Sequence, residues 1–187
     1  MLLSFTQGTQ SCGCHYFNKT FIFYKSLTQH LNAIAEYLPP LLLRLILAIE
    51  FGSAGLEKLN GSNWFSELSF PFPFNLLPPE FSWALATYFE IVGAIALLFG
   101  LATRFFSLSL LILTIVAIAS VHWASAIHSI NDLFAGYRII DEEGDGMGNY
   151  KLPLIYIVMF LPLIFNGAGK LSLDTLISNT LVQKSYS

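Results

Sequence analysis

Three ionisable residues, Arg44, Glu50 and Glu90, stand inside otherwise apolar stretches of the sequence. A charged side chain costs a few kcal/mol when it faces lipid unpaired, so we expect all three to face a protein interior. Two carboxylates at one depth in a low dielectric bind protons more tightly than they do in water. Glu90 and Glu50 are therefore candidate catalytic residues for proton transfer. A satisfied ion-pair cluster with Arg44 and the binding of a polar headgroup are the alternatives.

His122 is the third candidate catalytic residue. Histidine exchanges protons near neutral pH and is a common metal ligand. His122 stands near the end of an apolar stretch, with Trp123 beside it and His128 six residues further on. The alternative for a lone histidine in a membrane helix is a hydrogen-bonded residue at a helix interface.

The charged residues between 44 and 58 fall on two faces of one predicted helix. At about 100° per residue, Gly55 and Lys58 each project within about 40° of Arg44. Glu50 and Glu57 lie within about 20° of each other on a neighbouring face. This helix therefore offers a basic stripe and an acidic stripe.

Composition indicates that these residues are held by membrane helices. The chain of 187 residues is 55% hydrophobic and 11% charged, a balance that a water-soluble domain cannot cover with polar surface. Crossing the hydrocarbon core takes about 20 mostly apolar residues. Four stretches qualify, at about 39–59, 82–101, 105–127 and 152–171, and Pro162 inside the last predicts a kink. The predicted fold is an all-α, integral membrane four-helix bundle.

The segment before the first stretch predicts a surface helix. Apolar residues recur from Phe17 to Leu38 at the spacing of one helix face, which is typical of an amphipathic helix lying in the membrane interface. We divide the chain into an interfacial segment at 1–38, the bundle at 39–177 and a C-terminal tail at 178–187. Cys12 and Cys14 fall in the first segment as two free thiols, with soft-metal binding as the alternative.

The loops indicate the orientation. The connection at 60–81 is rich in aromatic residues and proline, which suits the headgroup belt. The acidic run at 141–149 matches half of an EF-hand pattern but has Leu152 where a bidentate Glu is required, so we assign no metal site. Basic residues favour a cytoplasmic side that holds both termini, and we expect a multi-pass protein of the inner (plasma) membrane. The counted residues are Lys19, Lys25, Arg104, Lys170 and Lys184 inside, against Lys58, Arg138 and Lys151 outside.

Three runs carry a resemblance to a known family. The runs RLILAIEFGSAGLEKLNG at 44–61, EIVGAIALLFGLATR at 90–104 and GAGKLSLD at 167–174 resemble the DoxX-like membrane proteins. The acidic loop followed by GNYKLPLIYIVMFLPLIF is similar to the HvfX-type subgroup, which is associated with maturation of copper-binding modified peptides. The resemblance implies a four-helix inner-membrane protein of poorly defined activity, and founding members are described as a subunit of a thiosulfate:quinone oxidoreductase. The candidate binding or structural charged cluster then consists of Arg44, Glu57, Lys58, Arg104 and Lys170.

Three functions remain open at this point. The first is an accessory membrane subunit that uses the charged cluster to engage a protein partner in a redox or peptide-maturation system. The second is a quinone-linked oxidoreductase subunit, in which Glu90, Glu50 or His122 transfers protons and quinone is the cofactor. The third is a small proton-coupled transporter acting as an oligomer. The lipid bilayer is the common partner, and the absence of a basic cluster argues against nucleic acid.

Overall fold

The regular structure of the described residues is entirely helical. The computed structural model describes residues 12–122, 130 and 150–185, and the predicted all-α class is confirmed for this part of the chain. The long helices are α1 (Cys12–Ala35), α2 (Leu38–Asn60), α3 (Pro79–Phe99), α4 (Thr103–Ala117), α6 (Lys151–Asn166) and α7 (Leu173–Ser185). A π-helical turn, η3 (Ile118–His122), continues α4, and two short 3-10 turns, η1 (Phe65–Glu67) and η2 (Phe74–Leu76), lie in the α2–α3 connection.

Proline and glycine set most of the helix boundaries. Prolines occupy the first turns of α2 and α3, where the missing N–H has no helical partner to lose. Gly100 ends α3 in the left-handed conformation, at φ 66°. α6 ends at Asn166 rather than near residue 171 as we predicted, because Gly167 and Gly169 both take positive φ. Of the third predicted span, 123–127 lies outside the described residues.

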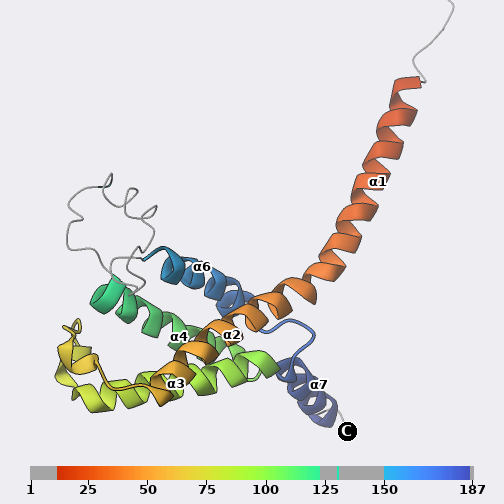
Figure 1. Ribbon diagram of the computed structural model, residues 1–187. Coiled ribbons are helices and arrows are strands. Elements are labelled where there is room, and N and C mark those ends of the chain that lie inside the picture. The colour runs from red at the N-terminus through yellow and green to blue at the C-terminus, as the bar shows by residue number, and fades with distance from the viewer. Residues whose placement is uncertain (1–11, 123–129, 131–149, 186–187) are drawn as a thin grey trace, which may run out of the picture.

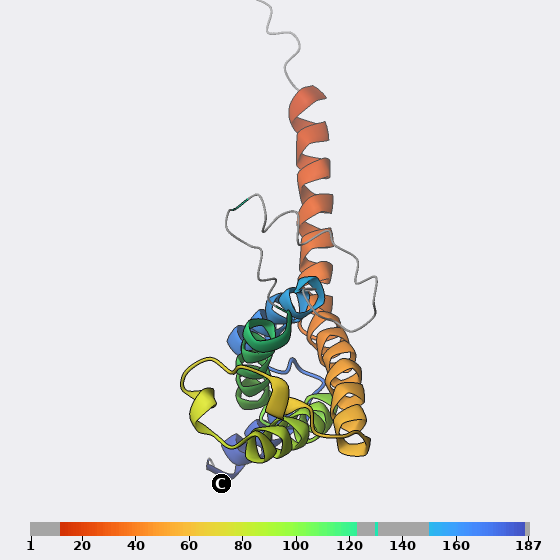
Figure 2. The same ribbon diagram turned by 60° about the vertical axis from the view of Figure 1, so that its left-hand side comes forward.

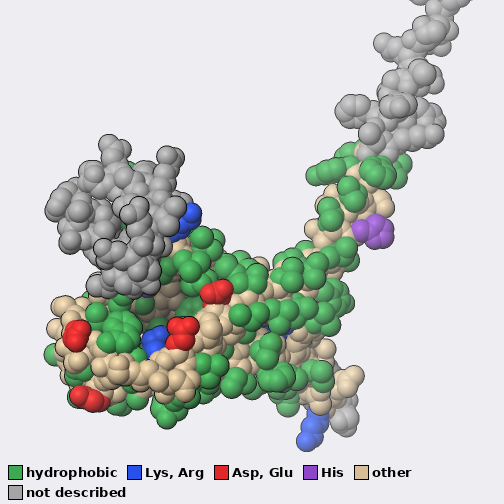
Figure 3. All heavy atoms as spheres, in the orientation of Figure 1, with side chains coloured by type: hydrophobic (Ala, Val, Ile, Leu, Met, Phe, Trp, Pro, Cys, Tyr) green, Lys and Arg blue, Asp and Glu red, His purple; other side chains and the backbone are tan. Residues whose placement is uncertain are grey.

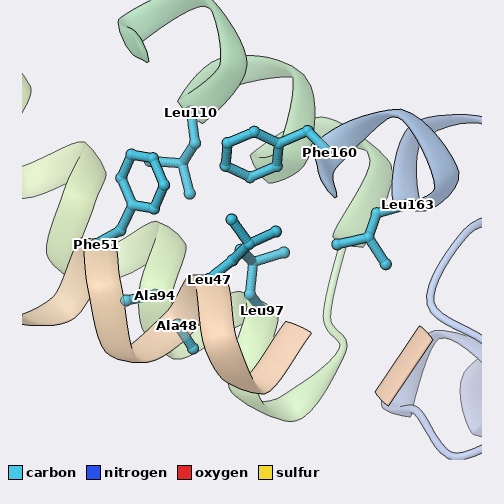
Figure 4. Close-up of a cluster of buried hydrophobic side chains, with 8 residues drawn as sticks. All are labelled: Leu47, Ala48, Phe51, Ala94, Leu97, Leu110, Phe160 and Leu163. Carbon is cyan, nitrogen blue, oxygen red and sulfur yellow. The ribbon is translucent and has the colours of Figure 1, made fainter. Parts of the chain in front are cut away.

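Helices α2, α3, α4 and α6 pack around one apolar core (Figures 1 and 2). Each of the four contributes side chains, and their tips converge between the helices in Figure 4. Two rings, Phe51 of α2 and Phe160 of α6, lie with centroids 5.3 Å apart. The core cluster consists of Leu47, Ala48, Phe51, Ala94, Leu97, Leu110, Phe160 and Leu163.

This bundle has two structurally distinct ends. We call the end formed by residues 61–78 and η3 the loop end, and the end formed by 100–104 and 167–174 the tail end. The loop end carries the aromatic α2–α3 connection. The tail end joins α3 to α4 and leads from α6 into α7.

Two helices project from the bundle. α1 stands away from it beyond the start of α2, and α7 leaves the tail end (Figure 1). A helix ahead of the first span was predicted and is present, with Phe21, Phe23 and Leu31 exposed. Its position in a membrane interface stays a prediction. Helix α7 was not predicted, and it continues through most of the segment at 178–187 that we expected as a tail.

By length and composition, two of the described helices are able to cross a membrane. They are α3 at Pro79–Phe99 and the continuous stretch Thr103–His122 formed by α4 and η3. α6 is as apolar but has 16 residues. α2 is 23 residues long and carries Arg44, Glu50, Glu57 and Lys58.

Candidate functional site

A cavity of about 440 Å³ lies at the loop end between α3, α4 and the α2–α3 connection. Its volume falls within the range typical of small-molecule sites, about 300–1,000 Å³. Most of its wall is aromatic or aliphatic, and a few polar groups reach into it. The apolar wall includes Trp64, Phe65, Phe70, Phe74, Leu77, Phe89, Ile112, Leu113 and Val116, and the polar groups are Lys58, Ser82, Glu90, Ser109, Ser120 and His122.

An ion pair joins α2 to α3 at this cavity. Lys58 Nζ donates to both carboxylate oxygens of Glu90, at 2.9 and 2.8 Å. The side chains are 17% and 4% exposed respectively, so the pair is largely removed from solvent. A pair that is buried and bidentate positions both groups firmly.

Close approach of the two helices makes this pair possible. Gly55 lies one turn before Lys58 on the same face of α2, and a Cβ there would lie 2.7 Å from Cγ1 of Ile91. Atoms do not approach so closely, so only glycine permits this separation. The small residue at 55 therefore lets Lys58 reach Glu90 across the interface.

Two serine hydroxyls face the cavity without a partner. The Oγ atoms of Ser82 and Ser120 are buried and make no hydrogen bond within the described part of the chain. Buried hydroxyls normally find a partner. An acceptor-bearing ligand in the cavity would provide one.

Aromatic rings form the outer wall of the cavity. The Phe65 ring packs against those of Trp64, Phe70 and Trp83, with centroids 5.0–5.1 Å apart. The contacts with Trp64 and Trp83 are edge-to-face and the contact with Phe70 is tilted, and such packing fixes ring orientation as well as burying area. The connection between α2 and α3 is thus an ordered wall, and Trp64 within it faces the cavity.

Of the three candidate catalytic residues, the structure brings two to this cavity. Glu90 and His122 both line it, His122 from the π-helical turn η3. Glu50 does not join them: it is exposed, and Tyr156 Oη of α6 donates to its Oε2 at 2.6 Å. Our prediction that Glu50 faces the bundle interior was wrong, because the face of α2 that turns inward carries Arg44 and Lys58 instead.

The charged cluster is divided between the two ends. Arg44, 1% exposed, lies near the tail end, where its guanidinium donates to the carbonyl oxygens of Leu97 at 3.3 Å and Leu171 at 2.5 Å. A cation at the C-terminal end of α3 also meets the negative pole of that helix. Arg44 therefore holds helix ends together, and the predicted cluster of Arg44 with two glutamates does not form.

Three further charged residues complete the contacts of the tail end. Asp174 accepts from the backbone N–H groups of Ala102 at 2.7 Å and Thr103 at 2.9 Å, which caps α4. The exposed Arg104 donates to the Phe165 carbonyl at 3.3 Å. Lys170 pairs with Glu36 at the α1–α2 junction, and this hydrogen bond raises the pKa of Lys170 above its usual range. Glu57 is exposed on α2 and takes no part in the contacts described for either end.

The sequence model of the DoxX family matches residues 40–123, which run from the start of α2 to the end of η3. A protein of Haemophilus influenzae described as uncharacterized is 48% identical over 148 residues, or 78% of this chain and 87% of that protein. The chain belongs to the DoxX family. No solved structure matches it. As a DoxX protein it is associated with membranes, and the DoxX match contains Lys58, Glu90 and His122.

Several residues of the loop-end cavity and its surroundings were not predicted from the sequence. Ser82 and Ser120 gave no signal, since a serine in an apolar helix is ordinary. Asp174 stood within the DoxX-like run at 167–174, but the cap that it forms on α4 was not predicted. Cys12 and Cys14 lie in the first part of α1, at 12–20, whose side chains are not described, and the run at 141–149 lies outside the described residues. Among the described residues, no three His, Cys, Asp or Glu side chains gather as a metal site would require.

Proposed function

We propose that this DoxX protein crosses the inner membrane four times, through α2, α3, α4 with η3, and α6, and that both termini are cytoplasmic. The packing of these four helices around one core supports the proposal, since α2 and α6 then share the environment of the two helices that qualify as spans. Alternate helices run in opposite directions, which places the loop end outside and the tail end inside. The balance of basic residues favours this orientation.

We further propose that the cavity at the loop end binds a quinone and that the chain serves a redox system as its quinone-binding membrane subunit. The observation that carries this proposal is the Lys58–Glu90 pair at the wall of an otherwise apolar, aromatic cavity. A quinone has a flat ring with two carbonyl acceptors and an apolar tail. The Lys58 ammonium and the free hydroxyls of Ser82 and Ser120 are the donors that such carbonyls need.

Reduction of a quinone to a quinol takes up two electrons and two protons. The electrons would come from a redox protein bound to this subunit, and Glu90 and His122, which both line the cavity, would pass protons to the two carbonyl oxygens. Glu90, a carboxylate in its pair with Lys58, would first take up a proton through His122, which lines the same cavity, and would then pass that proton to the reduced ring. The HvfX-type role in peptide maturation stays a prediction.

Quenching of tryptophan fluorescence tests the quinone site, because Trp64 lines the cavity. We expect a short-chain ubiquinone to quench the tryptophan fluorescence of the purified protein in detergent saturably, and Trp64→Phe to remove most of that quenching. Lys58→Met removes a charge-assisted hydrogen bond worth about 1.5–3 kcal/mol, so the affinity for the quinone should fall about ten- to hundred-fold. Equal quenching in the parent and in Trp64→Phe would place the quinone elsewhere.

A second variant separates binding from folding. Lys58→Met alone leaves Glu90 buried and unpaired, which destabilises the fold as well. The double variant Lys58→Met/Glu90→Met removes both charges, and we expect it to fold and still to bind weakly. Glu57→Gln, one residue away on the exposed side of α2, is the matched control and should bind like the parent. If the double variant binds as tightly as the parent, the pair has no part in the site.

Reporter fusions test the membrane arrangement independently. A reporter fused after Ser187 should behave as cytoplasmic and one inserted near Gly146 as external. An external signal after Ser187 would contradict either the number of spans or their direction.

A further inference from the structure

The outward face of α2 carries polar residues in the middle of an apolar surface. Glu50, Ser53 and Glu57 are all exposed, and their spacing of three and four residues places them within about 60° of one another. This stripe lies opposite the buried face of the helix, which carries Arg44, Leu47, Ala48, Phe51 and Gly55. Acidic side chains are visible among the green apolar atoms of the bundle in Figure 3.

Glu50 is the member of the stripe whose position needs an explanation. Along the helix axis it lies about 18 Å from the start of α2 at Leu38 and about 15 Å from its end at Asn60. In a helix that spans the bilayer it therefore lies near mid-depth. A carboxylate facing lipid at that depth is unfavourable, and such residues in membrane proteins almost always meet a partner. This inference therefore rests on the proposal that α2 spans the membrane.

The contacts of Glu50 satisfy only half of its carboxylate. Its Oε2 accepts from Tyr156 Oη at 2.6 Å, and this bond holds the group at the edge where α2 meets α6. Its Oε1 has no partner in the part of the chain that the structure describes. Beside it, Ser53 donates to the Glu50 carbonyl at 2.9 Å and is small enough to let another helix approach.

Charge complementarity identifies the kind of partner. A carboxylate fixed in the membrane is best satisfied by a cation at the same depth. A second copy of this chain related by a two-fold axis would bring Glu50 towards Glu50, which is repulsive. Within the described spans the basic residues at depth, Arg44 and Lys58, already bind inward, so a second copy has no cation to offer there.

We propose that the α2–α6 edge docks a transmembrane helix of a different polypeptide, one that carries a lysine or arginine at the depth of Glu50. The cation binds Glu50 Oε1 while Tyr156 keeps Oε2, and the partner's backbone packs over Ser53. Ile46 and Ile49, both exposed on the same side of α2, supply the apolar contacts beside the polar ones.

Photocrosslinking in native membranes tests this surface. A benzophenone amino acid at position 53 should give a covalent adduct with another polypeptide, whereas the same group at position 92, an exposed valine on α3, should give at most a tenth as much. The captured polypeptide should contain a transmembrane segment with a lysine or arginine. In the Glu50→Leu background the adduct should fall about tenfold, and Glu50→Lys combined with an acidic residue at the partner's basic position should restore it.

Other outcomes would overturn the proposal. An adduct between two copies of this chain would assign the surface to a homodimer, and a captured span without a basic residue would refute the charge argument. Equal yields at positions 53 and 92 would mean that no specific surface exists. Glu50→Gln, which keeps the shape and accepts from Tyr156, should reduce the adduct at unchanged abundance, so loss of folding is distinguishable. Because Glu50 is outside the cavity, these variants should still show quinone quenching, and failure of either test leaves the other standing.

Discussion

Gly55 and Gly52 offer a direct test of how closely α2 and α3 pack. Both lie on α2 near α3, one turn apart, but they differ in the room around them. A Cβ at position 52 would lie 3.4 Å from the Ala94 Cβ, an ordinary contact. At position 55 it would meet three atoms at once, at 2.7 Å from Ile91 Cγ1, 3.1 Å from Glu90 Cβ and 3.2 Å from the Ile91 backbone nitrogen. The last two atoms cannot move without moving α3.

The expected difference follows from two terms. Replacing glycine by alanine in a helix stabilises it by about 0.5–1 kcal/mol, and this gain applies equally to both positions. Overpacking of a tight interface costs about 1–3 kcal/mol, and it applies only at 55. Gly55→Ala should therefore be less stable than Gly52→Ala by about 1–3 kcal/mol, which is about five- to hundred-fold in the unfolding equilibrium.

The measurement is unfolding of both purified variants in mixed detergent and SDS micelles, followed by circular dichroism. Gly52→Ala should unfold at the parent's SDS fraction or above it, and Gly55→Ala below it. Quinone quenching should weaken only in Gly55→Ala, because separation of the helices pulls Lys58 away from Glu90. Equal stability of the two variants would refute the close approach and, with it, our account of how the pair forms.

Two further predictions concern the tail end. Arg44→Lys should lower the unfolding free energy by about 1.5–3 kcal/mol, because the shorter lysine lacks the two separate guanidinium nitrogens that donate to the Leu97 and Leu171 carbonyls. In the same assay the exposed Arg104→Lys should change stability by less than about 0.5 kcal/mol. Asp174→Ala should lower the unfolding free energy by about 1–2 kcal/mol through loss of the α4 cap. Ser178→Ala, at an exposed position on α7, is the control and should leave stability unchanged. If Asp174→Ala also leaves stability unchanged, the cap contributes nothing.

Helix content was predictable because it rests on local signals. Apolar runs of membrane-spanning length, prolines in first turns and glycines at ends are all visible in one sequence, and α2 came within one residue of its predicted bounds. The end of α6 was not predictable in this way. Gly167 and Gly169 continue an apolar run in the sequence, and only the structure shows the positive φ angles that end the helix there.

The pairing of charges was harder to predict because it depends on which face of a helix turns inward. Angular spacing correctly grouped Arg44 with Lys58 and Glu50 with Glu57. It could not decide which group faces the core, and we assumed that every charge must. The structure turns the basic stripe inward and leaves Glu50 outside, so the depth that Glu50 and Glu90 were expected to share brings no contact between them.

The contacts of Arg44 have a consequence for how the chain is made. Its tighter acceptor, the Leu171 carbonyl, lies 127 residues later in the sequence, beyond all four helices of the bundle. Synthesis starts at the N-terminus, so α2 is complete long before the ribosome has made that acceptor. The Asp174 cap on α4 also comes from the segment made after α6. In the proposed four-span arrangement, the helices would therefore enter the membrane before the contacts of Arg44 and Asp174 form, and those contacts would wait for the stretch after Gly167.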